Sequence, residues 1–257
     1  GYDLSKLITG AFGTLVAITE ITLKVLPKQK SCSTVVIYTD EKKLVNELFK
    51  KISSSSSEVS GAVFIPEEPQ DENYKFNKEK VFKFNDLTSN KPFLAFRVEG
   101  DKASIEEKIK ELNQELELNK LKTAILDVHQ SIPFWKKVNS LELFSQTNNN
   151  LLRIVVPPSS SIKLIQHIEN KFKYYIDWCG SLYWIEVQSK KNSKVSDIKK
   201  LTKELEGYLT IIKTSDEYDY EETIFTVDDI RLLISGKIKK SFDPKRIFNP
   251  GKMYRGI

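Results

Sequence analysis

Five residues near the start of the chain, Gly10-Ala11-Phe12-Gly13-Thr14, have the side chains needed to let a phosphate group approach the backbone. Glycine has no Cβ, so N–H groups around Gly10 and Gly13 can come close to an anion. The segment precedes a strand-like run rather than a helix, and it is neither a G-x-G-x-x-G fingerprint nor a Walker loop. By itself it predicts either a nucleotide contact or a plain turn.

Few residues are available to bind a metal. The only histidines are His129 and His167, and the only cysteines are Cys32 and Cys179. They are far apart in sequence, with no Cys-x-x-Cys and no Cys/His ligand spacing, so this chain alone cannot build a zinc or iron–sulfur site. We expect free thiols and no metal site. We expect His129 at a polar edge, with catalysis as the alternative, and His167 on a surface or in an interface.

Apolar patterning predicts the elements that must position these residues. The run 19–25 alternates, with Ile21, Leu23 and Val25 on one face, which predicts a half-buried strand that ends at Pro27. From Ser33 to Thr214 the pattern reads β-α-β-β-α-β twice. This predicts an α+β fold of ferredoxin-like type, an antiparallel sheet covered by helices. The expected strands are 34–38, 59–65, 92–99, 122–128, 151–156, 174–178, 181–187 and 208–213, and the expected helices follow Asp40 and cover 101–118, 133–138, 159–172 and 193–205.

The C-terminal part predicts a helix followed by a rigid loop. Thr226 is the expected N-cap of the helix, and its apolar positions predict a buried stripe. Two prolines, an asparagine and a glycine then restrict the backbone within 241–254. The stripe consists of Val227, Ile230, Leu233, Ile234 and Ile238.

Composition excludes several other classes of protein. The net charge of +5 comes from 40 basic and 35 acidic residues, a weak field for this length. The lysine pairs lie on amphipathic helices beside acids, which favours solvated faces over a nucleic-acid patch. The apolar runs are too short to span a bilayer. We therefore expect a globular protein with no nucleic-acid partner and no transmembrane segment.

Segments at both ends and in the centre resemble one protein family. "GYDLSKLITGAFGTLVAITEITLKVLPK" (1–28) is similar to the closing segment of the FAD-binding domain in flavoproteins of the vanillyl-alcohol-oxidase (PCMH) type. "DPKRIFNPGKMY" (243–254) resembles the family's terminal segment. "FWKKV" (134–138), "LLRIVVP" (151–157) and "YIDWCGSLYWIEV" (175–187) resemble the accessory FAD-binding subunit of bacterial glycolate oxidase. Two rare patterns in the right order at opposite ends are more specific than either alone.

The resemblance implies an FAD site shared with residues outside this chain. It places the phosphate-side turn at 10–14, where alanine replaces the commoner serine of the family, and the adenosine along the following strand. It brings the tail toward the flavin through Asn249, for which a structural loop role is the alternative. The implied FAD-binding residues are Gly10, Ala11, Gly13, Thr14, Ala17, Ile18 and Asn249.

The resemblance also implies an activity and partners. The family complex oxidises glycolate, a small 2-hydroxy acid, to glyoxylate by hydride transfer to flavin, and an iron–sulfur subunit takes the electrons. Because the clustered histidines of the catalytic flavoprotein are absent, the chain fits the accessory subunit beside that paralogous FAD subunit. Arg153 is the possible catalytic residue: it can hold a carboxylate or the anionic side of the flavin, or it lies on the solvent face or in an interface ion pair. Trp178, Tyr183 and Trp184 are expected to be core aromatics.

These expectations divide the chain into three parts. Residues 1–30 would be the C-terminal remnant of the FAD-binding domain, 31–224 the α+β cap domain, and 225–257 the helix and loop that return to the FAD domain. The FAD site would then be incomplete, the fragment inactive alone, and the complex cytoplasmic or peripheral at the inner membrane. The alternative is a non-enzymatic α+β protein-interaction module.

Overall fold

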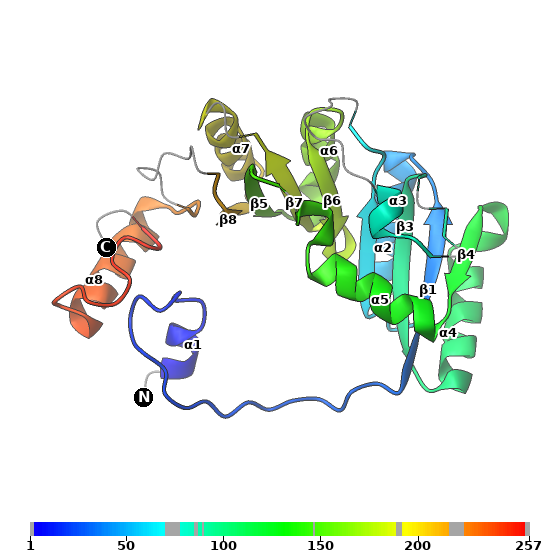
Figure 1. Ribbon diagram of the computed structural model, residues 1–257, viewed down its shortest axis with the longest axis horizontal. Coiled ribbons are helices and arrows are strands. Elements are labelled where there is room, and N and C mark those ends of the chain that lie inside the picture. The colour runs from blue at the N-terminus through cyan, green and yellow to red at the C-terminus, as the bar shows by residue number, and fades with distance from the viewer. Residues whose placement is uncertain are drawn as a thin grey trace.

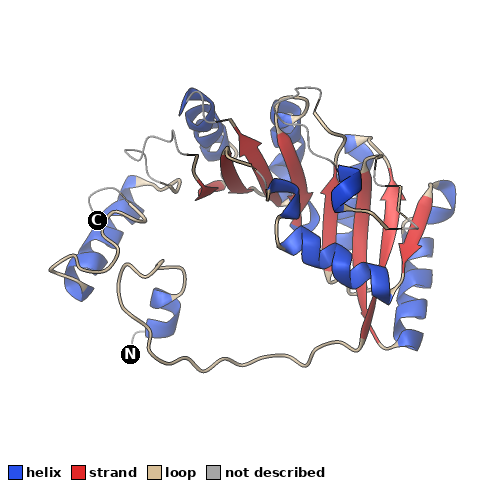
Figure 2. Ribbon diagram, viewed as in Figure 1, coloured by secondary structure: helices blue, strands red, loops and turns tan. Residues whose placement is uncertain are grey.

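The computed structural model describes residues 3–69, 78–84, 87–88, 90–145, 147–188, 192–215 and 224–254. Within these ranges, eight strands form one antiparallel sheet in the order β4-β1-β3-β2-β6-β7-β5-β8 (Figures 1 and 2). The strands are β1 Ser31–Tyr38, β2 Gly61–Ile65, β3 Phe93–Gly100, β4 Thr123–Leu126, β5 Asn150–Val155, β6 Lys173–Asp177, β7 Leu182–Val187 and β8 Tyr208–Lys213. The helices are α1 Leu4–Ile8, α2 Lys42–Ser53, α3 Lys78–Val81, α4 Lys102–Glu115, α5 Val128–Asn139, α6 Ser161–Ile168, α7 Asn192–Glu204 and α8 Asp229–Phe242.

The sheet confirms the duplicated α+β pattern. Strands β1 to β4 lie in the order β4-β1-β3-β2. Strands β5 to β8 lie in the order β6-β7-β5-β8, which is the same arrangement read in the opposite direction along the sheet. The two halves join edge to edge where Phe64 of β2 pairs with Ile176 of β6. Each half would expose a hydrogen-bonding edge if it stood alone, so the junction protects one edge of both.

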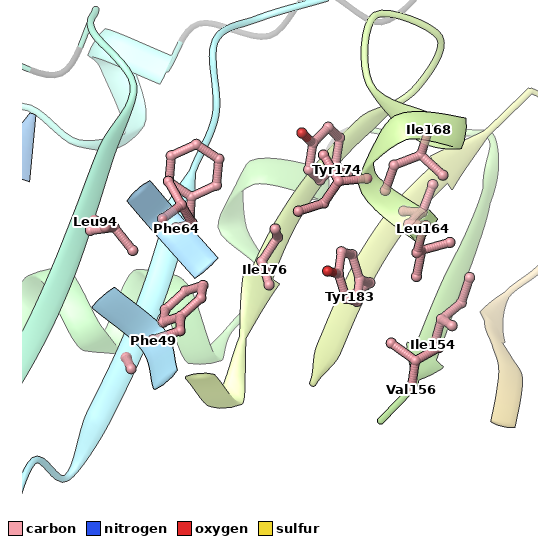
Figure 3. Packing of buried hydrophobic residues seen from close by; sticks show 14 of the residues in the cluster. Phe49, Phe64, Leu94, Ile154, Val156, Leu164, Ile168, Tyr174, Ile176 and Tyr183 are labelled. Carbon is pink, nitrogen blue, oxygen red and sulfur yellow. The ribbon is translucent and has the colours of Figure 1, made fainter. Parts of the chain in front are cut away.

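Two layers of side chains cover the sheet. Buried residues of α2, α4, α6 and α7 pack on one face, and Figure 3 shows part of this cluster. It includes Phe49, Phe64, Ile154, Leu164 and Tyr183, each no more than 2% exposed. The second cluster lies on the opposite face, where α5 crosses the N-terminal half of the sheet (Figure 1). The strands are therefore apolar on both faces over this half, as buried sheets require.

Helix α5 begins earlier than its expected start at 133. Asp127 and Gln130 form a capping box, which satisfies backbone N–H groups at the start of the helix. The helix is then fixed on the sheet by Thr34, whose hydroxyl accepts hydrogen bonds from Ser131 Oγ and Trp135 Nε1, both at 2.8 Å. Pro133 is the sixth residue of this helix and lacks the N–H that would otherwise bond to the His129 carbonyl.

The predicted strand at 19–25 is not part of the sheet. Residues 16–30 run extended from the N-terminal turn to β1 and make no hydrogen bond to any residue that the structure describes (Figure 1). Ile21, Leu23 and Val25 are 65%, 68% and 77% exposed. Their alternation is typical of a strand, but a strand needs a neighbouring edge to pair with, and the described residues offer none here.

The C-terminal helix also departs from expectation. Its N-cap is Asp228, whose side chain accepts from the Arg231 backbone N–H, and not Thr226, whose hydroxyl instead accepts from Leu209 of β8. Ile230 and Leu233, predicted to be buried, are 71% and 61% exposed. The apolar stripe exists in sequence, but this face of α8 meets no partner among the described residues.

No helix in the described ranges is long and apolar enough to cross a membrane.

Candidate functional site

The Gly10–Thr14 turn follows the short helix α1. Asp3 caps α1, and the turn then adopts positive φ at Gly10 (80°), Phe12 (52°) and Gly13 (68°). Two of its amides are used internally: Ala11 N–H donates to Ile8 O and Thr14 N–H donates to Ala11 O. The N–H groups of Gly10, Phe12 and Gly13 find no acceptor among the described residues. The turn therefore presents free, closely spaced donors.

A cavity of about 150 Å³ opens beside this turn. On one side it is lined by Gly10, Ala11 and Thr14, and on the other by the stem of Lys239 and by Tyr254. A Cβ placed on Gly10 would have no heavy atom within 4 Å, so the space over this glycine is open to a ligand. Thus two segments from opposite ends of the chain together form the cavity wall.

Lys239 of α8 ties the turn to the C-terminal tail. Its ammonium donates to Thr14 O at 2.6 Å, to Asp243 Oδ2 at 2.7 Å and to Phe248 O at 2.7 Å. The side chains of Lys239 and Asp243 are each only 3% exposed. A lysine is rarely buried unless it is paired, and here its three donors have three acceptors.

Asp243 is the acceptor around which the tail folds. Besides Lys239, it accepts from the backbone N–H groups of Ile247 and Phe248 at 2.9 and 2.8 Å. Burial raises the pKa of this carboxyl, but the hydrogen bonds from Lys239 and the two amides outweigh burial and lower the pKa to about 2. Asp243 is therefore charged at neutral pH.

Asn249 completes the contact between the tail and the turn. Its Nδ2 donates to Phe12 O at 3.2 Å and to Gly13 O at 3.3 Å. Phe12 also packs edge-to-face on Phe225, with ring centroids 5.0 Å apart. Because a Cβ on Gly13 would lie 2.9 Å from Asn249 Nδ2, this position requires glycine for space as well as for its positive φ.

The structure groups most, but not all, of the predicted cofactor residues. Gly10, Ala11 and Thr14 line the cavity, while Gly13 and Asn249 meet beside it. Ala17 and Ile18 lie on the exposed extended segment and not among the cavity-lining residues. Sequence reasoning missed Lys239 and Asp243, although their i, i+4 spacing on a predicted helix was a usable signal.

Arg153 lies elsewhere, on β5 of the sheet (Figure 1). It sits between Trp184 of β7 and Thr210 of β8, on the face opposite α6 and α7. Its guanidinium stacks on Trp178, with Cζ 5.0 Å from the ring centroid, and donates no hydrogen bond to a described residue. Burial raises the pKa of the nearby Asp177 carboxyl, opposed by the Trp178 N–H bond and by the positive charges of Arg97 and Arg153. Among the described residues, Arg153 therefore keeps free donors, and its side chain is half-buried on this face of the sheet.

One of the three expected core aromatics is exposed. Tyr183 is fully buried and Trp184 is half-buried, whereas Trp178 is 57% exposed. Trp178 and Cys179 both have positive φ, 49° and 50°, and this tight connection between β6 and β7 turns the indole out of the core. The expectation of a core role for Trp178 was wrong, because the backbone turn decides its direction.

The histidines occupy surface positions. His129 in α5 and His167 in α6 are both exposed. No cluster of three or more His, Cys, Asp or Glu side chains suited to a metal ion occurs in the part of the chain that the structure describes.

Comparison with known proteins shows what the whole chain is similar to. The chain is similar to "Glycolate oxidase subunit GlcE" of Escherichia coli (strain K12), with 23% identity over 257 residues, 99% of this chain and 58% of that protein. Among solved structures, a 4-ethylphenol oxidase from Gulosibacter chungangensis matches with a TM-score of 0.54 and 11% identity over 88% of this chain and 54% of that one. The chain shares the α+β fold of the part of that oxidase that it covers.

Further comparisons are consistent with this fold. An alkyldihydroxyacetonephosphate synthase matches with a TM-score of 0.50 and 16% identity, over 97% of this chain and 50% of that one. The chain thus spans 58% of the length of the curated relative and about half of each solved structure. No protein-family profile matches the chain.

The turn has donors and space suited to an anionic group. A diphosphate needs backbone donors and close backbone approach. The N–H groups of Gly10, Phe12 and Gly13 have no acceptor among the described residues, and the space over Gly10 is open. The cavity of about 150 Å³ is large enough for a phosphate group and too small for a whole dinucleotide.

Proposed function

We propose that this chain is part of an FAD-binding subunit of an oxidoreductase acting on a small 2-hydroxy acid, of the glycolate oxidase type. The observation that carries the proposal is the Gly10–Thr14 turn, which presents free amides beside a cavity and is held by the tail. The likeness to GlcE along 99% of the chain supports the choice of complex. The bound flavin would accept the hydride from the substrate.

Within this proposal the turn residues and Asn249 hold the phosphate side of the cofactor, and Ala17 and Ile18 lie along its adenosine. Arg153 offers its free donors to the substrate carboxylate at this face of the sheet. Trp178 keeps the guanidinium in place by stacking. An iron–sulfur subunit and a paralogous FAD subunit are the proposed partners, and glyoxylate is the proposed product from glycolate.

The exposed extended segment supports a site completed by other residues. Ile21, Leu23 and Val25 alternate on one side of an unpaired strand, and the matched relative is longer than this chain. We propose that the remaining length of such a protein supplies the neighbouring sheet edge and the rest of the FAD surface. These 257 residues alone would then bind FAD weakly, and the full-length gene product would bind it tightly.

Two measurements test the proposal. The first compares FAD affinity of the 257-residue chain and the full-length product by flavin fluorescence; tight binding by the chain alone would contradict the shared site. The second measures glycolate-dependent dye reduction by the reconstituted complex. Omission of this subunit should abolish reduction, and unchanged activity would favour the non-enzymatic interaction module.

The role of Arg153 has its own test in that complex. Arg153→Met removes a charge-assisted hydrogen bond worth about 1.5–3 kcal/mol, so KM for glycolate should rise about 10- to 150-fold. Lys163→Met on the exposed face of α6 is the control and should leave KM unchanged. An unchanged KM for Arg153→Met assigns this arginine to the surface or to an interface.

A further inference from the structure

We propose that Lys239 is the positioning residue of the cofactor turn, fixing the free amides of Gly10–Thr14 against FAD without itself contacting the phosphates. This inference rests on the proposed function and adds to it a residue outside the predicted site. Lys239 lies 225 residues from Thr14 in sequence and bonds its carbonyl at 2.6 Å. Among the described residues that line the cavity, Lys239 is the only lysine or arginine.

The hydrogen bonds of Lys239 show why it positions rather than binds. An ammonium has three donors. All three are occupied, by Thr14 O, Asp243 Oδ2 and Phe248 O. A phosphate oxygen would have to displace one of them, whereas the amides of Gly10, Phe12 and Gly13 have no competing acceptor among the described residues.

Thr14 transmits the effect to the turn. Its N–H and its hydroxyl both donate to Ala11 O, at 2.9 and 2.6 Å. This double contact fixes the Ala11 carbonyl, and the same planar peptide group carries the Phe12 N–H on its opposite side. Holding Thr14 O therefore fixes the orientation of the intervening amides, because the turn closes over only four residues.

The same ammonium fixes the other side of the turn. Phe248 O and Asp243 are its remaining acceptors, and Asp243 also holds the amides of Ile247 and Phe248. The next residue is Asn249, which bonds the carbonyls of Phe12 and Gly13. Lys239 thus holds Thr14 of the turn and the tail residue next to Asn249. It does so from a position that is 2% exposed, where water does not weaken its hydrogen bonds.

Lys239→Met in the full-length protein tests this role, with Lys240→Met as the matched control on the exposed side of the same helix. Removing one member of a buried, hydrogen-bonded charge pair has a large effect, so we expect FAD affinity to fall at least about 30-fold. Hydrogen exchange at Thr14 N–H, measured without FAD, should accelerate by a similar factor. Lys240→Met should change neither quantity.

A second variant separates positioning from a purely structural role. Lys239→Met/Asp243→Asn removes the uncompensated buried carboxylate and should recover the thermal stability lost in the single variant. FAD affinity should stay low in this double variant, because Thr14 O still lacks its donor. Affinity that returns together with stability would overturn the positioning role.

The outcomes also distinguish this inference from the proposed function. If the wild-type full-length protein binds no FAD, the proposed function fails and the cofactor role of Lys239 fails with it. If the wild type binds FAD and Lys239→Met binds it equally well, only the role of Lys239 is overturned. Unchanged exchange at Thr14 N–H in Lys239→Met would overturn the mechanical basis of the inference directly.

Discussion

Replacing each glycine of the Gly10–Thr14 turn by alanine separates the cost of backbone strain from the cost of steric contact. Gly10 and Gly13 have similar positive φ, 80° and 68°. An L-residue in this region costs roughly 1–2 kcal/mol, so both variants should lose about that much of the turn's stability. At Gly10 nothing further is expected, since its added Cβ would meet no atom within 4 Å.

Gly13→Ala should cost more, because its Cβ would lie 2.9 Å from Asn249 Nδ2. The amide is the end of a flexible side chain and can move away, but it then loses its bonds to Phe12 O and Gly13 O. Two such bonds are worth about 0.5–1.5 kcal/mol each, and partial exposure puts the sum near 1–2 kcal/mol. Gly13→Ala should therefore destabilise the turn by a total of about 2–4 kcal/mol.

Hydrogen exchange at the Ala11 and Thr14 amides measures these costs, since Ala11 N–H donates to Ile8 O at the start of the turn and Thr14 N–H donates to Ala11 O across it. After correction for intrinsic rates, Gly13→Ala should exchange about 5- to 30-fold faster than Gly10→Ala. In an Asn249→Ala background the two alanine variants should become equal. Equal rates in the wild-type background, or a difference that persists without Asn249, would refute the steric reasoning.

Two further predictions concern buried charges. Lys173 and Glu186 form an ion pair of 3.1 Å with side chains only 7% and 5% exposed, and Thr147 and Asn149 also donate hydrogen bonds to Glu186. Lys173→Met should therefore lower the free energy of unfolding in urea by about 3–5 kcal/mol, and Lys173→Met/Glu186→Met should recover most of that loss. A loss below about 1 kcal/mol in the single variant would contradict a desolvated pair. The pKa of Asp243 is lowered from 3.8 to about 2, so its stabilisation of the tail is complete above about pH 4 and is lost as the pH falls toward 2. The protection of the Phe248 amide, its exchange corrected for intrinsic rates, should fall over that window, and Asp243→Asn should abolish this pH dependence.

Much of the sheet could be predicted because strand and helix periodicities are local properties. Strands β1 to β8 fall close to their expected ranges, and the duplicated β-α-β-β-α-β order appears in the sheet. The expected start of α5 at Pro133 was wrong, because a capping box at Asp127 lets the helix begin five residues earlier, at Val128. The domain boundaries at 30/31 and 224/225 remain predictions.

Patterning failed where the outcome depended on a partner surface. The segment 19–25 and the stripe on α8 have the alternation and spacing of buried elements, yet Ile21, Leu23, Ile230 and Leu233 are exposed. An amphipathic pattern states which side of an element is apolar, and burial needs a second surface to meet that side. Trp178 was placed in the core for a similar reason, and two positive φ angles turned it outward.

The sequence by itself determined the α+β class, the glycine turn at 10–13, the rigid tail and the resemblance that joins them. These depend on residue types within a few positions of each other. Only the tertiary structure decided that Lys239 and Asn249 hold the turn, that Ala17 and Ile18 lie outside the cavity, and that Arg153 keeps free donors. A hydrogen bond between residues 225 positions apart leaves no periodic trace in the chain, because the fold brings together groups whose spacing in sequence is unconstrained.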